Sequence, residues 1–146
     1  MYRSYDDPSF AKVDDIRMPV GTAGVTISSA VSTLTELARW PVLSPGKVVG
    51  AHLYVLVGGT AASATGTVEL RKVAAGDSLS SASPTFGSCA FVSGVGVANQ
   101  SVVDFAVSET DFSKGDFVVL TQTTGQPGVT LTTHPYLKWQ ERFTAE

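Results

Sequence analysis

The feature that most constrains this chain is an alternation of apolar and polar residues with a period of two. It recurs in five short segments: Val48–Val57, Thr67–Val73, Val102–Ser108, Phe117–Thr123 and Val129–Thr133. A period of two puts successive side chains on opposite faces of a β-strand, whereas a helix requires a period near 3.6. Glycine, proline or short polar turns separate the segments. The pattern therefore predicts an all-β fold, an antiparallel, jelly-roll-like β-sandwich of about eight strands.

The first part of the chain does not follow this pattern. Proline, glycine and paired aspartates interrupt every candidate period, although the segment carries several large apolar side chains: Tyr2, Tyr5, Phe10, Val13, Ile16 and Met18. Such a segment is either an irregular edge of the domain or an arm that docks on another surface. Docking is favoured, because aromatic side chains in a solvated tail gain nothing. We therefore expect an N-terminal arm over residues 1–24 and a β-sandwich domain over residues 25–146.

Two apolar rows predict the position of the segment Val48–Val57. One row holds Val49, Ala51, Leu53, Val55 and Val57, and the other holds Val48, His52, Tyr54 and Leu56. Because both rows are apolar, we expect a central strand that is covered on both sides. Ser44-Pro45-Gly46 precedes the strand and predicts a type II turn, in which Gly46 takes a positive φ.

Two segments near the start of the domain are also expected to be strands. Val25–Ile27 alternates with polar neighbours and predicts a short first strand. Ser32–Trp40 fits either a helix, with Thr33 and Glu36 as a capping box, or a strand that Pro41 ends. The strand is favoured because its apolar residues alternate.

The second half of the chain contains several expected connections. Ala74–Pro84 is rich in serine and alanine and predicts a long surface loop, and Phe112–Asp116 predicts a turn. A weaker strand is expected around Cys89–Phe91. Thr124–Gly128 is expected to close a hairpin between the two alternating segments that flank it. Pro135 is expected to put a break or a sheet edge into the last strand.

Composition excludes several classes of function. Charged residues make up 16% of the chain, against about 25% in typical proteins. A net charge of −3 with scattered lysines and arginines gives no basic surface for nucleic acid or for an anionic membrane. The polar first residues predict no signal peptide, and the single cysteine, Cys89, excludes an internal disulfide. We expect a protein that is made in a reducing cytoplasm, packs against neighbours and binds neither nucleic acid nor membrane.

The residues that could carry chemistry form no recognisable site. His52 and His134 lack partners at metal-ligand spacing, and Cys89 has no positive neighbour to activate its thiol. Four carboxylates gather around one hairpin: Asp104, Glu109, Asp111 and Asp116. They could hold a cation, but they lack the order of a calcium loop, so solvated turn carboxylates are favoured. We predict no catalytic, cofactor-binding or metal-binding residue, and a protein that is not an enzyme.

Large aromatic and apolar side chains are the candidates for partner binding, because protein interfaces are enriched in them. Trp40 and Trp139 are either core residues of the sandwich, which is favoured, or anchors for a partner. The candidate partner-binding residues are Tyr2, Tyr5, Phe10 and Ile16 in the arm and Trp139 in the last strand.

A series of short motifs runs from Leu37 to Trp139. They are Arg39-Trp40-Pro41-Val42, a Pro-Gly turn, Val48–Val55, Gly66–Lys72, Phe112–Asp116 and Pro127–Leu131. Their order resembles small β-sandwich domains of tailed-phage structural proteins, which occur in capsid decoration (cement) proteins, head fibres and tail fibre tips. The short length and the N-terminal arm make the chain most similar to the decoration proteins.

This resemblance implies a non-enzymatic viral structural protein that decorates and stabilises a phage capsid by binding the major capsid protein. It also implies a homotrimer on the outer surface of the virion, made in the host bacterial cytoplasm and using no cofactor. In such an assembly several modest contacts would add up through multivalency.

Three other functions stay open at this stage. The chain could be a carbohydrate- or receptor-binding tip or a head or tail fibre component, but the loops Thr60–Gly66 and Ala74–Pro84 lack the aromatic residues that such a tip needs. It could be a glycan hydrolase, for which the sequence offers no convincing carboxylate pair. It could also be a connector or tail-assembly protein, which would share the same composition.

Overall fold

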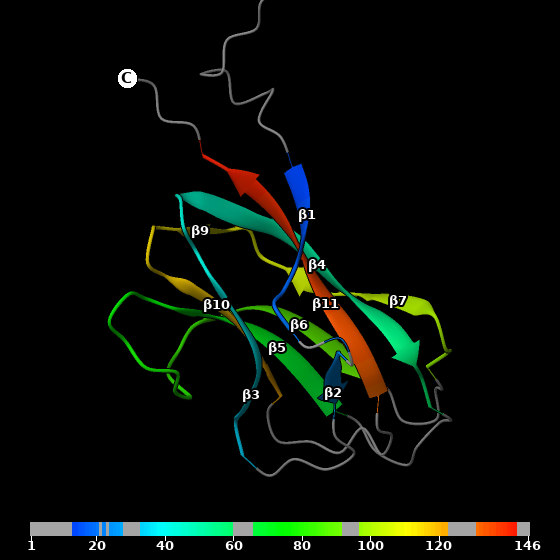
Figure 1. Cartoon of the computed structure of the whole chain (residues 1–146). Coiled ribbons are helices and arrows are strands. Elements are labelled where there is room, and N and C mark those ends of the chain that lie inside the picture. Colours follow the sequence, from blue (N-terminus) through cyan, green and yellow to red (C-terminus); the bar gives the residue numbers. More distant parts are fainter. Residues whose placement is uncertain are drawn as a thin grey trace, which may run out of the picture.

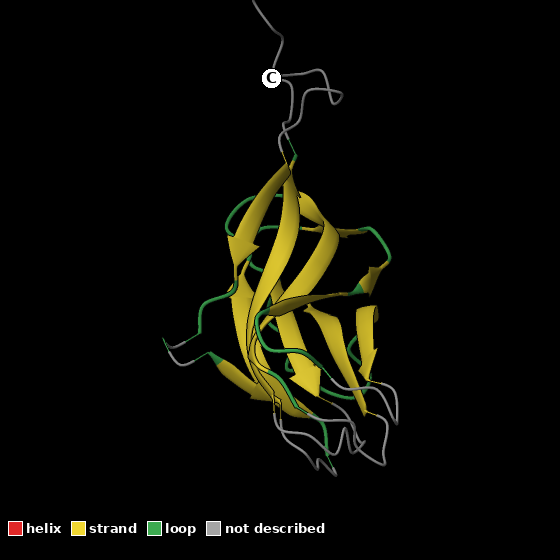
Figure 2. Cartoon of the chain, turned by 90° about the vertical axis from the view of Figure 1, so that its right-hand side faces the viewer, coloured by secondary structure: helices red, strands yellow, loops and turns green. Residues whose placement is uncertain are grey.

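The computed structural model describes residues 13–20, 22, 24–27, 33–59, 66–91, 97–122 and 131–142. Within these ranges the chain forms eleven β-strands and no helix. The strands make two antiparallel sheets that face each other as the two layers of a sandwich (Figure 1 and Figure 2). The predicted all-β sandwich is therefore confirmed.

The first sheet is centred on the two longest strands of the described chain, β4 and β11 (Figure 1). Its order is β1-β11-β4-β7, with β2 also paired to β11 and β9 also paired to β4. The strands are β1 Val13–Arg17, β2 Val25–Ile27, β4 Gly46–Val57, β7 Ser101–Asp104, β9 Thr110–Phe112 and β11 Leu131–Glu141.

The second sheet has the order β3-β10-β5-β6-β8. The strands are β3 Thr35–Pro41, β5 Gly66–Val73, β6 Thr85–Phe91, β8 Ala106–Val107 and β10 Phe117–Gln122. Thr35–Trp40 of the expected segment Ser32–Trp40 is thus a strand, as expected, whereas Thr33 and Leu34 precede it. Along the chain the strands pass repeatedly from one sheet to the other, which gives the jelly-roll-like topology.

The core lies between the two sheets and is apolar. Its largest fully buried members include Phe112, Met18, Ile27, Leu53, Leu70, Leu120, Leu131 and Leu137. Trp139 packs edge-on against Trp40, with 4.9 Å between the ring centroids. A Cβ on Gly46 would lie 2.4 Å from Cζ2 of the Trp139 indole, so only glycine fits beside this ring. The expected positive φ at Gly46 is wrong, because only Gly24, Gly76 and Gly115 have one among the described glycines.

Part of the expected arm belongs to the sandwich. Val13–Arg17 is β1 and pairs along its whole length with β11, from Val13 opposite Gln140 to Arg17 opposite Tyr136. Met18 follows as a fully buried core residue, and its N–H donates to the Pro135 carbonyl at 3.0 Å. The edge interpretation, which the sequence left as the alternative, therefore describes this stretch. Residues 1–12 lie outside the described ranges.

The expected strand Val102–Ser108 is divided between the two sheets at Phe105. β7 pairs with β4 in the first sheet, and β8 pairs with β6 in the second. Between them the buried Phe105 donates its N–H to the Ala51 carbonyl at 2.9 Å. The apolar and polar residues of Val102–Ser108 thus alternate without a break, although the chain passes from the first sheet to the second within this segment.

The expected hairpin around Thr124–Gly128 is wrong. β10 pairs with β3 and β5, whereas β11 pairs with β1, β2 and β4, so the strands on either side of this segment lie in different sheets. The segment itself lies outside the described residues.

Pro135 does not end β11. Its missing N–H falls where the edge partner of β11 changes from β2 to β1, so the proline removes no ladder bond to either strand.

β4 is central, as expected, but it is not covered on both sides. Register shifts opposite Trp139 and Thr133 put Val48, Ala51, Leu53 and Val55 on the buried side, which breaks the two rows expected from strict alternation. The opposite side, which includes His52 and Tyr54, stays partly exposed. A β-bulge adds one residue to one strand and so changes the side on which later residues point.

Candidate interaction surface

The outer side of the first sheet carries a cluster of aromatic and apolar side chains. Directly opposed residues of antiparallel strands share one side of a sheet, so the register gives the layout. One row holds Arg17, Tyr136, His52 and Asp104, the next holds His134, Tyr54 and Val102, and a third holds Thr26, Thr132 and Val57. We call this side the aromatic face, and define it by His52, Tyr54, Val57, Val102 and Tyr136.

The aromatic face holds two of the four exposed large hydrophobic side chains of the described residues. The four are Val13, Leu43, Val57 and Val102, which are 48%, 75%, 55% and 56% exposed. Val13, Val57 and Val102 all point outward from the first sheet, and Leu43 lies between β3 and β4. Single exposed apolar residues are common, but a contiguous group on one face marks an interaction site.

The centre of the aromatic face is ordered by ring stacking. His52 and Tyr136 are opposed on β4 and β11, with ring centroids 5.0 Å apart and an interplanar angle of 8°. Tyr54 is the next outward residue on β4 and is opposed to the exposed Val102 on β7. β4, β7 and β11 thus bring these side chains together on one side of the sheet.

The two ends of the central row of the aromatic face carry opposite charge. Arg17 on the β1 edge and Asp104 on the β7 edge are both exposed and end the same row. Arg17 donates from Nη2 to Nδ1 of His134 at 2.9 Å. Within the described part of the chain, no salt bridge involves Arg17 or Asp104.

His134 lies at the base of this surface and is almost buried, with 8% of its area exposed. Gly24 covers its ring, since a Cβ on Gly24 would come within 3.2 Å of Cε1. Burial lowers the pKa of His134, and the nearby positive charge of Arg17 lowers that pKa further. Because Nδ1 accepts a hydrogen bond from Arg17, the neutral form of this histidine matches its surroundings.

The outer side of the second sheet is different, because its charges are paired. We call it the charged face, defined by Glu36, Arg39, Glu69 and Arg71, which flank the outward Val119 and Thr121 of β10. Arg39 contacts Glu36 at 2.6 Å, and Arg71 contacts Glu69 at 2.7 Å. Arg39 also lies over the Phe117 ring, 4.8 Å from its centroid. These contacts leave no apolar cluster comparable with the aromatic face among the described residues.

Arg71 also holds the long loop that follows β5. Its Nη1 donates to the Ser83 carbonyl at 2.8 Å and to the Ser81 carbonyl at 3.3 Å. The predicted loop Ala74–Pro84 is confirmed, and these bonds fold it back against the charged face. Nε of Arg71 is buried and has no hydrogen-bond partner.

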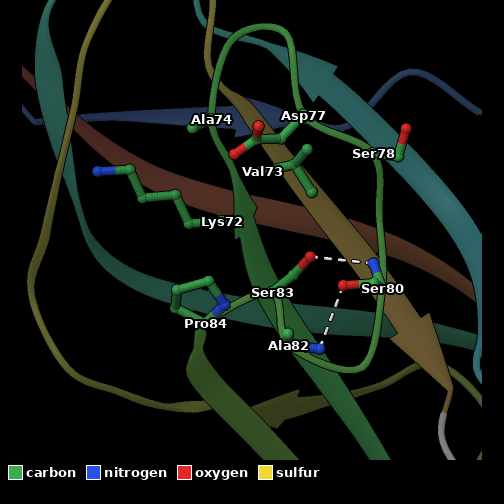
Figure 3. Close-up of a pocket in the computed structure, with 9 residues that line it drawn as sticks. All are labelled: Lys72, Val73, Ala74, Asp77, Ser78, Ser80, Ala82, Ser83 and Pro84. Carbon is green, nitrogen blue, oxygen red and sulfur yellow. Dashed lines mark hydrogen bonds between the residues drawn. The ribbon is translucent and has the colours of Figure 1, made fainter.

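This loop and β5 enclose a shallow hollow of about 450 Å³ (Figure 3). Its lining is made of small and hydroxyl side chains with one carboxylate: Lys72, Val73, Ala74, Asp77, Ser78, Ser80, Ala82, Ser83 and Pro84. The hydroxyl groups of Ser80 and Ser83 accept hydrogen bonds from the backbone of their own loop. The Ser80 N–H donates to Ser83 Oγ at 3.0 Å, and the Ala82 N–H donates to Ser80 Oγ at 3.2 Å. No aromatic residue lines the hollow, so it lacks the platform on which a sugar ring stacks.

The four carboxylates that could have held a cation do not converge. Glu109 contacts Lys47 at 3.0 Å, and Asp111 contacts Arg142 at 2.6 Å. Asp116 accepts hydrogen bonds from the N–H groups of Ser113 at 2.8 Å and Ala75 at 3.2 Å, which fixes the predicted turn. Among the described residues no group of three or more histidine, cysteine, aspartate or glutamate side chains could hold a metal ion.

Cys89 is a buried core residue of β6, 3% exposed. Burial raises the pKa of its thiol to about 11, and the negative charge of Asp104 contributes to the rise. A thiol with such a pKa stays protonated at neutral pH and is a poor nucleophile.

The candidate partner-binding residues fall in three places. Tyr2, Tyr5 and Phe10 lie outside the described residues. Ile16 is opposed to Leu137 on the inner side of the first sheet and packs against the core. Trp139 is 5% exposed and belongs to the core, which is the interpretation that the sequence favours for it. Neither residue lies on the aromatic face.

Sequence reasoning missed the aromatic face itself. His52 and Tyr54 were expected under a second layer, and Tyr136 and Val102 were not singled out. A usable signal was present, since Tyr136 follows Pro135 on a strand whose other side is Leu131, Leu137 and Trp139. The pairing of β11 with β4, which brings Tyr136 onto His52, was not deducible from the local pattern.

Comparison with known proteins does not identify a family. No protein-family model matches the chain, and no curated protein matches it. A solved structure of Eiger TNF from S. frugiperda superposes with a TM-score of 0.48 and 13% identity, over 92% of this chain and 95% of that one. At this identity and TM-score the likeness does not assign a function. Within the described residues no helix is long and apolar enough to cross a membrane.

Proposed function

We propose that this chain is a non-enzymatic structural protein that decorates and stabilises a tailed-phage capsid by binding the major capsid protein. The observation that carries an assembly role is the aromatic face, where His52, Tyr54, Val102 and Tyr136 form an open apolar surface. A surface of this kind is suited to contact with another protein.

The phage setting rests on the order of the sequence motifs. Val48–Val55 lies within β4, Gly66–Lys72 within β5, and Phe112–Asp116 is the turn that Asp116 closes. A long strand and a tight turn are what the resemblance implies at two of these places, but β5 is not the pairing partner of β4, because β5 pairs with β6 and β10 in the second sheet. The proposal includes a homotrimer on the outer surface of the virion, in which several copies share the load of capsid contact.

The chemistry of the described residues agrees with a role that needs no catalysis. Glu109 and Asp111 are engaged in ion pairs, Asp116 is engaged in a turn, Cys89 is buried, and no aromatic residue lines the hollow beside Ala74–Pro84. An enzyme site would instead gather titratable groups with shifted pKa values in a cleft.

The proposal is tested by mixing the purified full chain with undecorated phage capsid shells and measuring the mass of the particles. We expect the chain to join the shells at a fixed ratio and to raise the temperature at which they open. Lysozyme at the same concentration is the control for nonspecific adsorption. A chain that leaves shell mass and shell opening unchanged contradicts the proposal, and glycan binding by the same sample would then support a fibre-tip role.

A further inference from the structure

The central row of the aromatic face has a positive residue at one end and a negative residue at the other, while Asp15, two residues before Arg17 on β1, lies opposite Lys138 outside this row. Across its central row the order is Arg17, Tyr136, His52 and Asp104. Four strands at a spacing of about 4.8 Å put the two charges roughly 14 Å apart, on either side of the stacked rings. Each edge charge lacks an opposite charge among the described residues of its own chain.

We infer that the aromatic face is covered by a second copy of this chain, in a contact that pairs the Arg17 edge of one copy with the Asp104 edge of the next. The face is complementary to itself, because each copy supplies both the positive and the negative edge. Charge complementarity of this kind fixes which edges meet, while the apolar centre supplies the free energy of association.

Such a contact extends over the whole outer side of the first sheet. The four strand widths, and the eleven residues of β11 at about 3.4 Å each, give this side a planar area of roughly 700 Å², of which the aromatic face, opposite Thr132–Tyr136, takes up about half. A stable protein interface typically buries about 800 Å² on each partner. The charged face is less suited to this role, since Arg39 and Arg71 already have carboxylate partners.

The inference deepens the proposed assembly role and rests on it for its setting, but its test requires no capsid. The full chain is studied by mass photometry and sedimentation velocity over a range of concentrations. We expect Arg17→Asp and Asp104→Arg each to weaken self-association by more than about tenfold, because like charges then meet at the contact. The double variant Arg17→Asp/Asp104→Arg should associate as the wild type does.

Mixing the two single variants tests the pairing directly. When the Arg17→Asp variant meets the Asp104→Arg variant, opposite charges face each other again at the contact. The mixture should therefore associate more strongly than either variant alone. Because the face of one copy covers the same face of the other, the contact joins two copies and is separate from any contact that closes a homotrimer. The mixture should therefore regain wild-type association, and a mixture that associates no more strongly than the single variants contradicts the pairing.

Controls separate this contact from general effects of charge and from misfolding. Lys114→Asp and Asp77→Arg make the same charge changes at exposed turn and loop positions outside the aromatic face and should leave association unchanged. Circular dichroism of each variant confirms folding, and Val102→Glu, at an exposed position in the apolar centre, should also give monomers. A wild-type chain that stays monomeric overturns the inference even if it binds shells. The inference is also overturned if neither the mixture nor the double variant regains the self-association of the wild type.

Discussion

The two outer faces of the sandwich are both formed by antiparallel strands, but their side chains differ in chemistry. On the charged face, Arg39 and Arg71 are held by Glu36 and Glu69 of the same chain, so its polar groups are satisfied internally. On the aromatic face, exposed valines surround a stacked His52–Tyr136 pair, and the edge charges of that row have no opposite charge in the described chain. The difference is the basis of our proposal that a second copy completes the aromatic face, whereas the charged face is satisfied within its own chain.

The largest expected effect separates the two sides of β11. Trp139→Ala removes a buried indole that contacts Trp40 and should lower the free energy of unfolding by about 3–5 kcal/mol, as for other buried aromatic residues. Tyr136→Ala, three positions away on the outer side, should cost only about 1 kcal/mol, the scale of one stacked aromatic pair. Urea unfolding followed by circular dichroism measures both, and equal losses would show that Tyr136 is a core residue.

A second prediction sharpens the description of the charged face. Arg71→Ala should cost about 2 kcal/mol, because it removes bonds to Ser81, Ser83 and Glu69 at an 8% exposed site. Arg39→Ala, at a more exposed pair, should cost less than about 1 kcal/mol. Urea unfolding gives the two values, and subtilisin cleavage within Ala74–Pro84 should accelerate only in the Arg71 variant. Unchanged cleavage there would mean that Arg71 does not hold the loop.

A third prediction concerns pH and the base of the aromatic face. The pKa of His134 is lowered in the folded chain, so the unfolded chain binds more protons once the pH falls below about 6.5. Stability is therefore full above that pH and decreases as the pH falls further. Urea midpoints at pH 7.5 and pH 5 should show this loss in the wild type and less of it in His134→Gln.

The matched control for the pH prediction is His52→Gln, which removes the other histidine of the chain. This variant should keep the loss of stability at low pH. If the His134 variant loses as much stability as the wild type, the buried contact with Arg17 is not the origin of the effect. Carboxylates contribute their own pH dependence, which both variants share.

The smallest expected effect concerns the core beneath the two faces. Burial raises the pKa of Cys89 to about 11, so the thiol is protonated and shielded. The folded chain at pH 8 should react with a disulfide reagent at least about a hundredfold more slowly than the chain in urea. Comparable rates in both states would show that β6 opens frequently.

The fold was largely predictable because alternation is a local property. The strands at Val25–Ile27, Val48–Val57 and Thr67–Val73 follow from their own residues. Errors arose where pairing over long distances decides the outcome. Phe105 divides one alternating segment between two sheets, and β11 joins β4 instead of β10. Nothing in the local sequence distinguishes a hairpin partner from a strand in the opposite layer.

The candidate surface was harder to predict than the fold. His52 and Tyr54 read as residues of a covered strand because their row is apolar, and apolar rows are buried in most sheets. Only the structure shows that no second layer covers that side in the described chain. Trp139, which sequence composition offers as a partner anchor, is instead enclosed by the core beside Gly46.

Hydroxyl-radical footprinting with mass spectrometry compares the two faces most directly. The full chain is labelled at high and at low concentration, and the oxidation of Tyr54 and Tyr136 is compared with that of Phe117 on the charged face. We expect Tyr54 and Tyr136 to be protected at high concentration and labelled on dilution, with Phe117 unchanged. Equal labelling of Tyr54 and Tyr136 at every concentration, in a sample whose mass shows association, would contradict the claim that the aromatic face is completed by a second copy.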